Sequence, residues 1–367
     1  MKITCSKNDL YNGLQIVQKA IPSKTTKDIL ECVLIDASSN ELHLTANDME
    51  LGIETIVSAK IEEHGRVCLE SKTFIDMIRN LPDDQVSIET NPRDEARIDC
   101  LNVHFKLPGR SGDDFPYLPI IPRNEPIKIS QFTLREIIQQ TIFSISETDV
   151  KRVLNGELIE INGNKLRISS LDGHRISIRN IELKDSYDES SVIIPGKSLN
   201  EIARILNGSL EDMVYIYLTE NHVIFDFDQT TVITRLIEGK FFDINRMLSD
   251  DYETKVVINR RDLMGSINRA ILLINDSDKK PLIWNVHDQS FEMHLSSTKG
   301  NFDEELFIVK EGRDIQIAFN PRFIADVLRV VEDENITIYL LSPSTPCFIR
   351  DDAKNYIYVV LPVNFKS

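Results

Sequence analysis

Two groups of residues have types and spacings that could carry out chemistry. Pro195-Gly196-Lys197-Ser198 follows an expected strand and resembles the end of a phosphate-binding loop, but Ser191 stands where that loop has its first glycine. Asp226 and Asp228, together with Asp243, could hold the two metal ions of a nuclease. Acidic residues are abundant in this chain, so their presence alone does not identify a metal site. An ATP-binding protein and a metal-dependent nuclease stay open as alternatives.

Other signatures of catalysis are missing, since the sequence has no Gly-x-Ser-x-Gly and no His-Glu-x-x-His. Five cysteines are scattered, without Cys-x-x-Cys spacing: Cys5, Cys32, Cys68, Cys100 and Cys347. This pattern argues against a disulfide framework or a zinc site and favours the reducing cytoplasm. The sequence begins without an apolar core of signal-peptide length, and no apolar run approaches the roughly 18 residues of a membrane span. We therefore expect a cytoplasmic protein with no catalytic residue, metal, cofactor or membrane association.

The elements that would position any site come in three repeats. Residues 2–21, 128–145 and 256–274 each read as a short strand, a polar break and an amphipathic helix. Helical spacing of apolar residues marks each segment: Leu10, Leu14, Val17 and Ile21; Leu134, Ile138 and Ile142; Leu263, Ile267, Ile271 and Ile274. Ile3, Ile129 and Ile258 open these segments and are offset by 126 and 129 residues.

A strand–helix–strand unit also recurs three times, beginning at Gly65, Ser190 and Arg313. The expected core faces of its helices are Phe74, Met77 and Leu81; Leu199, Ile202 and Leu206; and Phe323, Val327 and Val330. The first residues of these faces are offset by 125 and 124, so two independent features agree on one period. The fold class we predict is α+β, with two helices in each repeat backed by antiparallel sheet.

Two connectors separate the repeats. Residues 108–126 contain five prolines and cannot form a central strand or a long helix. Phe241-Phe242 falls 126 residues after Phe115-Pro116, at the same point of the repeat. We therefore predict three domains, at residues 1–125, 126–253 and 254–367.

Charge is divided unevenly between these elements. The whole chain carries −16, whereas the six expected helices together carry +6, which leaves −22 for the remainder. Lysine and arginine are good helix formers, so mildly basic helices are also found without any function. The functional interpretation is that the helices face DNA phosphates and bind them without sequence preference, while the acidic remainder faces outward.

Four stretches carry a family resemblance: Asp172-Gly173-His174-Arg175, Asp149 to Gly156, Asp113 to Pro116, and Tyr358 to Val363. With the triplication, they make the whole chain similar to the β subunit of bacterial DNA polymerase III, the sliding clamp. The resemblance implies a DNA clamp fold and a head-to-tail homodimer that closes into a ring around double-stranded DNA. It also implies that the ring confers processivity by binding the polymerase III catalytic subunit, the clamp loader and other proteins with a clamp-binding motif.

The number of helices agrees with two subunits in such a ring. Helices pack about 10 Å apart, so twelve around a hole give a diameter of roughly 38 Å, whereas six give about 19 Å, too narrow for a duplex.

The resemblance also implies site residues. A cleft for partner peptides would be lined by Leu154, Leu171, Gly173, His174, Arg175, Ile176, Phe242, Arg246, Met247, Asn320, Phe323, Ser344, Pro346, Val359, Val360, Leu361, Pro362 and Val363. DNA would be bound by Lys24, Lys72, Arg79, Thr148 and Lys197. The dimer interface would join Leu272 and Leu273 to Met77, Leu81 and Phe105 of the neighbouring subunit.

Each assignment has a plainer alternative. His174 could simply shape a turn, the basic residues could be solvated surface charges, and the interface residues could fill the core of their own domain. A scaffold that binds peptides but no DNA is the remaining alternative for the whole protein.

Overall fold

The computed structural model describes residues 1–146, 150–275 and 280–365, which contain six α-helices and 25 strands, all paired antiparallel. The described chain forms two compact units. Unit 1 comprises Met1–Arg135 and Lys197–Leu236, and unit 2 comprises Glu136–Gly196 and Ile237–Ser367. The units do not coincide with the predicted repeats, because the second repeat contributes to both.

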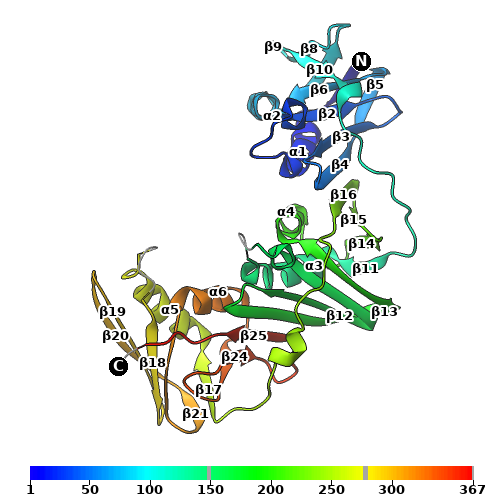
Figure 1. Ribbon diagram of the computed structural model, residues 1–367. Coiled ribbons are helices and arrows are strands. Elements are labelled where there is room, and N and C mark those ends of the chain that lie inside the picture. The colour runs from blue at the N-terminus through cyan, green and yellow to red at the C-terminus, as the bar shows by residue number, and fades with distance from the viewer. Residues whose placement is uncertain (147–149, 276–279, 366–367) are drawn as a thin grey trace. The chain divides into compact units, whose positions relative to one another are not determined.

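The helices form where apolar periodicity predicts them. They are α1 (Lys7–Val17), α2 (Ser71–Asn80), α3 (Gln131–Gln139), α4 (Gly196–Ile205), α5 (Arg260–Ile271) and α6 (Pro321–Val330). Polar residues cap several of them. The Ser6 hydroxyl accepts from the amide of Asp9 at 3.0 Å, and the side chains of Asn259 and Asn320 accept amides at the starts of α5 and α6. In Figure 1, α1 lies beside α2, and α5 beside α6.

Unit 1 contains two sheets. The first has the strand order β5 (Ala59–Glu63), β1 (Lys2–Ser6), β7 (Gln85–Thr90), β8 (Ala96–Cys100), β9 (Val103–Leu107). The second has the order β10 (Gly109–Ser111), β6 (Arg66–Glu70), β2 (Cys32–Asp36), β3 (Leu42–Asn47), β4 (Leu51–Val57), β16 (Thr230–Arg235), β15 (His222–Phe227), β14 (Met213–Leu218), β11 (Ile127–Ser130).

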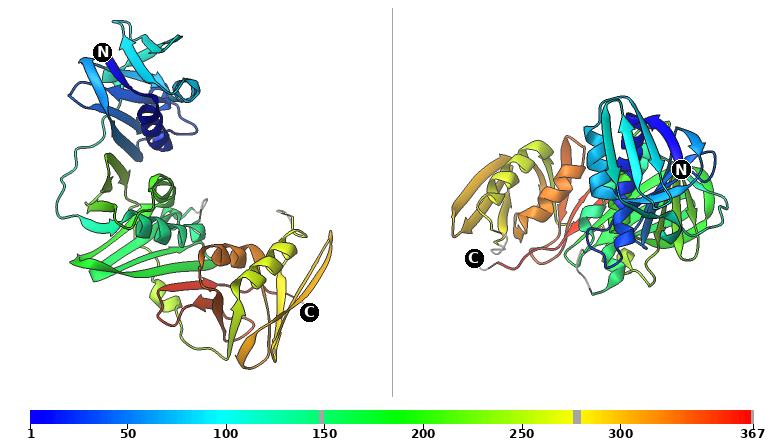
Figure 2. Two further views of the ribbon diagram at one scale, coloured as in Figure 1. Left: turned by 180° about the vertical axis from the view of Figure 1, so that it is seen from behind. Right: turned by 90° about the horizontal axis from the view of Figure 1, so that it is seen from above.

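Unit 2 also contains two sheets. The larger has the order β12 (Gly156–Leu171), β13 (Arg175–Pro195), β25 (Tyr356–Val360), β24 (Cys347–Arg350), β23 (Asn335–Leu340), β17 (Thr254–Asn259), β21 (Val309–Gly312). The smaller has the order β20 (Gly300–Phe307), β19 (Ser290–Ser297), β18 (Leu282–His287), β22 (Ile315–Phe319). The left view of Figure 2 shows the long green hairpin of β12 and β13 beside the red strand β25.

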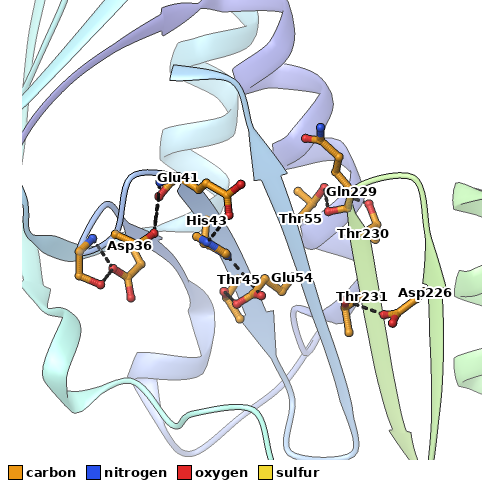
Figure 3. Close-up of polar contacts among 12 residues, drawn as sticks. Asp36, Glu41, His43, Thr45, Glu54, Thr55, Asp226, Gln229, Thr230 and Thr231 are labelled. Atoms are coloured by element: carbon orange, nitrogen blue, oxygen red, sulfur yellow. Dashed lines mark hydrogen bonds and ion pairs between the residues drawn. The ribbon is translucent and has the colours of Figure 1, made fainter. Parts of the chain in front are cut away.

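Two joints carry a sheet across a predicted repeat boundary. In unit 1, β4 pairs with β16, so that Leu51 lies opposite Thr234. A buried contact of 2.9 Å between the hydroxyls of Thr55 and Thr230 crosses this joint (Figure 3). In unit 2, β13 pairs with β25, so that Arg175 lies opposite Val360. These joints explain why the second repeat is shared between the two units.

Helix burial corrects two of the predicted core faces. On α2 the buried apolar residues are Phe74, Ile75 and Ile78, and Met77 is only half-buried. On α6 the core face consists of Ile324, Ala325, Val327 and Leu328, whereas Phe323 and Val330 are half-buried. A run of neighbouring apolar residues fits more than one face at 3.6 residues per turn, so periodicity alone did not select the face.

Candidate functional site

The joint between β13 and β25 brings together many of the predicted cleft residues. Leu154, Leu171, Ile176 and Val359 belong to one buried apolar cluster, and half-buried Phe242 packs against it. Lys151 places its ammonium 5.0 Å from the centre of the Phe242 ring. The cluster supports the surface but is hardly exposed itself, since Leu154 is 4% and Leu171 5% exposed.

Val360 corrects the predicted lining. It is fully buried in the core around α5 and α6, whereas its neighbour Val359 belongs to the cluster at the joint. Successive residues of a strand point to opposite faces of the sheet, so consecutive residues of β25 do not line one surface.

The Asp172-Gly173-His174-Arg175 motif forms the turn between β12 and β13. Gly173 has φ = +84°, in the left-handed region that favours glycine. The carboxylate of Asp172 accepts the amides of His174 and Arg175 at 3.0 and 3.1 Å. His174 is exposed, and its ring stacks on Phe323 with centroids 5.9 Å apart. These contacts favour a shaping role for His174 in the turn and the adjacent surface.

Arg175 is the most constrained side chain of this region. Its guanidinium binds Asp172 at 2.9 Å and Asp326 of α6 at 2.6 Å, and donates to the carbonyl of Phe143. It also lies 4.5 Å from the centre of the Phe323 ring. With 12% of its side chain exposed, Arg175 ties the turn to α6. Sequence reasoning missed Asp326, because an isolated aspartate on a helix gives no signal of its distant partner.

Three exposed apolar side chains lie on two segments, the 244–247 turn and the residues that follow β25. Met247 is 45% exposed, and Leu361 and Val363 are 41% and 37% exposed. The amide of Leu361 donates to the carbonyl of His174 at 2.8 Å, which places the segment after β25 directly against the turn. Arg246, next to Met247, is paired with Asp243 at 2.8 Å.

A cavity of about 620 Å³ opens in the same unit near the end of the chain. Ser344 and Val363 line it together with residues of β22 and the loop after β23. Among the other predicted cleft residues, Asn320 caps α6, and Pro346 and Pro362 are half-buried. An apolar surface with a few fixed polar groups is suited to binding an extended peptide.

The predicted DNA-binding residues that the structure describes all lie in unit 1 and are exposed: Lys24, Lys72, Arg79 and Lys197. Two of them already have acidic partners, since Arg79 binds Asp76 at 2.9 Å and Lys197 binds Asp48 at 2.6 Å. The Arg79 pair is exposed on both sides and therefore weak, so phosphate can compete for that cation, whereas the Asp48 carboxylate is only 7% exposed. Thr148 lies outside the described residues.

The predicted interface residues differ in what they can offer a second subunit. Leu272 is 73% exposed, and Leu273 is half-buried against the core of unit 2. Met77 and Phe105 are half-buried in unit 1. Leu81 is only 5% exposed, so for this residue the structure favours the alternative that it fills the core of its own unit.

The phosphate-loop resemblance has a structural explanation. The Ser198 hydroxyl is buried and hydrogen-bonded to Thr234 at 2.7 Å, so it is not presented to a nucleotide. A Cβ at Gly196 would lie 2.2 Å from the terminal side-chain carbon of Ile145, so a larger residue there would displace the Ile145 side chain.

The three aspartates of the nuclease alternative each have a local partner. Asp226 accepts from Thr231 at 2.7 Å, Asp228 accepts from Gln131 at 3.2 Å, and Asp243 pairs with Arg246. Over residues 1–146, 150–275 and 280–365, no three His, Cys, Asp or Glu side chains are grouped as metal ligands would be. No helix in the same ranges is long and apolar enough to span a membrane.

Models of the three domains of the DNA polymerase III beta subunit match the chain in order: the N-terminal domain at residues 1–119, the central domain at 128–243 and the C-terminal domain at 245–364. The chain belongs to the DNA polymerase III beta subunit family. The Beta sliding clamp of Staphylococcus epidermidis is 30% identical to it, with 99% of each chain covered.

Solved structures of this family have the same fold. A putative DNA polymerase III beta subunit from Eubacterium rectale matches with a TM-score of 0.96 and 52% identity, over all of both chains. A DNA polymerase sliding clamp from Bacillus subtilis matches with a TM-score of 0.95 and 28% identity, again over all of both chains. The predicted family and α+β clamp fold are thereby confirmed. The chain is a non-catalytic processivity clamp, as sliding clamps are.

Proposed function

We propose that this chain pairs head to tail with a second copy, forming a closed ring that encircles duplex DNA and tethers the replicative polymerase. The observation that carries the proposal is the repeated sheet joint. At each joint, the second strand of a hairpin in one repeat pairs with the last strand of the following repeat: β4 with β16, and β13 with β25. In the third repeat, β20 is equivalent to β4 and β13, and in the first repeat, β9 is equivalent to β16 and β25. In the described part of the chain, β20 and β9 each pair with a strand on one side only.

The two joints have the same register. The amide of Arg235 donates to the carbonyl of Glu50 at one joint, and the amide of Leu361 donates to the carbonyl of His174 at the other. In the hairpin of β19 and β20, Ser297 lies opposite Gly300, the first residue of β20. Gly300 is therefore equivalent to Leu51, the first residue of β4, and to Arg175, the first residue of β13. The hairpins that precede β9 and β16 both turn through a residue of positive φ, Leu101 and Asp228.

This equivalence gives the register of the proposed interface between subunits. Gly300 would lie opposite Leu107 of the partner subunit, Phe302 opposite Phe105, and Asp303 opposite His104. Burial agrees with this pairing, because Phe302 and Phe105 are half-buried while Asp303 and His104 are exposed. A slip of one residue would pair exposed positions with half-buried ones along the whole strand.

The ring requires two subunits, so molar mass in solution tests it. A chain of 42.0 kDa should sediment as a dimer at micromolar concentration. A monomer under these conditions would contradict a stable ring. We further propose the three domains at 1–125, 126–253 and 254–367, and a cytoplasmic location, which fits five cysteines that are all buried and free.

For DNA binding, we propose that Lys24, Lys72, Arg79, Thr148 and Lys197 contribute to a weakly basic surface that faces DNA. Exposed cations that exchange carboxylate partners for phosphates would bind without sequence preference and allow sliding.

For partners, we propose that peptides of the polymerase III catalytic subunit, the clamp loader and other clamp-motif proteins bind beside the 172–175 turn. Replacing both Met247 and Leu361 by alanine removes two exposed apolar side chains of the predicted cleft. We expect the Kd of a fluorescent polymerase-motif peptide to rise roughly 10- to 30-fold, at about 1 kcal/mol for each truncated side chain. Fluorescence anisotropy with purified dimer measures the change.

Leu210→Ala is the matched control, since Leu210 is 67% exposed in unit 1. It should leave peptide affinity unchanged, and the double variant should remain a dimer. An unchanged affinity in the double variant would show that peptides bind elsewhere.

A further inference from the structure

A row of four side chains crosses each sheet joint at right angles to the strands. In unit 1, cross-strand pairing places Thr45, Glu54, Thr231 and Asp226 in one row over β3, β4, β16 and β15 (Figure 3). The Thr45 hydroxyl donates to Glu54 at 3.3 Å, and the Thr231 hydroxyl donates to Asp226 at 2.7 Å. Hydroxyls alternate with carboxylates, and none of these four groups ordinarily titrates near neutral pH.

The equivalent row in unit 2 has different chemistry. Ser169, Ile178, Ile357 and Arg350 follow one another over β12, β13, β25 and β24. The two residues that meet at the joint are both isoleucines with at most 7% exposure. The row therefore has the same geometry at both joints but different residues. Side chains that lie directly opposite each other across a joint determine which two strand edges pair stably.

The two free strand edges carry the corresponding halves of a third row. On β8 and β9, Asp99 lies opposite His104, and its carboxylate is 2.6 Å from Nδ1 of the imidazole. On β19 and β20, His294 lies opposite Asp303, with a contact of 2.5 Å between Nδ1 and the carboxylate. In the register given above, Asp303 of the partner subunit comes to lie directly opposite His104.

We propose that His104 and Asp303 of the partner subunit form a proton-linked contact that selects these two edges for self-association. The complete row then alternates carboxylate, imidazole, carboxylate and imidazole over four strands. This inference rests on the proposed ring and adds its recognition chemistry and its response to pH.

The imidazoles of His294 and His104 differ in the number of carboxylates that already lie beside them within one chain. His294 already faces two carboxylates of its own chain, Asp303 and Glu292, and the hydrogen bond to Asp303 is the main cause of its raised pKa. His104 faces one carboxylate through Nδ1, which donates its proton to Asp99. A proton on Nε2 as well makes the ring an imidazolium, which is the form that a second carboxylate favours.

Both imidazoles have further charged groups beside them on the packed strands. Beside His104 they are Arg97 on β8, which binds Asp99 at 2.8 Å, and Lys106 on β9 itself. Beside His294 they are Glu292, which also binds His287 of β18 at 3.2 Å, and Asp303. From the partner subunit, Glu305 would lie diagonally to His104 and would add to the attraction. Proton uptake at His104 therefore accompanies association, which is tighter at low pH and weakens as pH rises through the histidine range.

The dimer Kd of the full chain at pH 6 and pH 8, at constant ionic strength, tests the proposal. An exposed ion pair changes affinity about two- to fivefold, so two interfaces per ring predict a Kd roughly 4- to 25-fold lower at pH 6. His104→Gln should bring the ratio of the two values close to one. His43→Gln, which removes a histidine paired with Glu54 at 3.3 Å inside a sheet, should leave the ratio unchanged.

A wild-type Kd that is independent of pH, or a ratio that survives His104→Gln, would overturn the proton-linked contact while leaving the dimer intact. Absence of a dimer at either pH would contradict the ring itself, so the two failures are distinguishable.

Discussion

Phe105→Asp is expected to weaken self-association by on the order of 100-fold or more, because in the proposed register it would bury a carboxylate opposite Phe302 of the partner subunit. Phe105 is half-buried on an edge strand, so the substitution exposes no deep core position of unit 1. The proposed ring would contain this interface twice, which would multiply the effect. Sedimentation velocity over a dilution series measures it.

A second variant separates the interface from general damage. Phe302→Lys combined with Phe105→Asp restores an attractive pair in the proposed register and should recover part of the dimer. Tyr117→Asp alters another aromatic residue of unit 1, 68% exposed, and should leave the dimer intact. If the single variant dimerises normally, β9 is not the interface strand. If the double variant is no better than the single, the register is wrong.

Glu157→Gln is expected to raise the free energy of unfolding at pH 7 by about 3 kcal/mol. Glu157 lies on β12 with no exposed surface, and neither carboxylate oxygen has a well-formed hydrogen bond among the described residues. Burial raises the pKa of this carboxyl from 4.5 to about 8, against a smaller opposing effect of the nearby Thr141 hydroxyl. The folded state therefore keeps the proton that the unfolded state releases.

The pH dependence has a definite sign. Between pH 4.5 and about 8 the folded state binds more protons at Glu157 than the unfolded state, so stability falls as pH rises through this range. The increase in the free energy of unfolding caused by Glu157→Gln should accordingly be small near pH 5 and large near pH 7. Urea unfolding followed by Trp284 fluorescence measures it, because the single tryptophan lies in the same unit.

Glu160→Gln is the control on the same strand, since Glu160 is half-buried and 3.9 Å from Arg167. It should change stability by no more than about 0.5 kcal/mol. Equal stability of wild type and Glu157→Gln at pH 7 would show that Glu157 finds a charge partner or water in solution.

The helices and the three-fold repeat were predictable because their signals are local. Apolar spacing marks each helix, and a period near 126 residues is visible in the positions of Ile3, Ile129, Phe74 and Leu199. The pairing of Arg175 with Val360 was not predictable, because residues so far apart in sequence meet only through the fold. The same holds for the ion pair between Arg175 and Asp326.

Glu157 escaped notice for a different reason. A glutamate in a strand that continues with Ile159 and Ile161 reads as the start of a half-exposed strand. Both faces of this segment are buried, because Leu158 faces the cluster at the joint while Glu157 lies near Thr141. Burial on both faces depends on how the sheet packs, so the alternation of polar and apolar residues along the strand does not reveal it.

The candidate site was predicted in part. Resemblance identified the residues around the turn, and the structure brings Leu171, Ile176, Phe242 and Val359 into one cluster. The resemblance did not distinguish the buried residues beneath the peptide-binding surface from the exposed residues that form it. Leu361 and Met247 are exposed and Leu154 is not, because that difference depends on which side of a strand or loop faces the core.

Retention on DNA of different topology tests the proposed ring most directly. Clamp assembled on a nicked circular duplex should stay bound through gel filtration at moderate salt, and a single cut that linearises the circle should release it. A ring that encircles DNA can leave only over a free end, so linear DNA with blocked ends should retain it again. Equal retention on linear DNA with open ends, or release from the intact circle, would show that the protein binds DNA without encircling it.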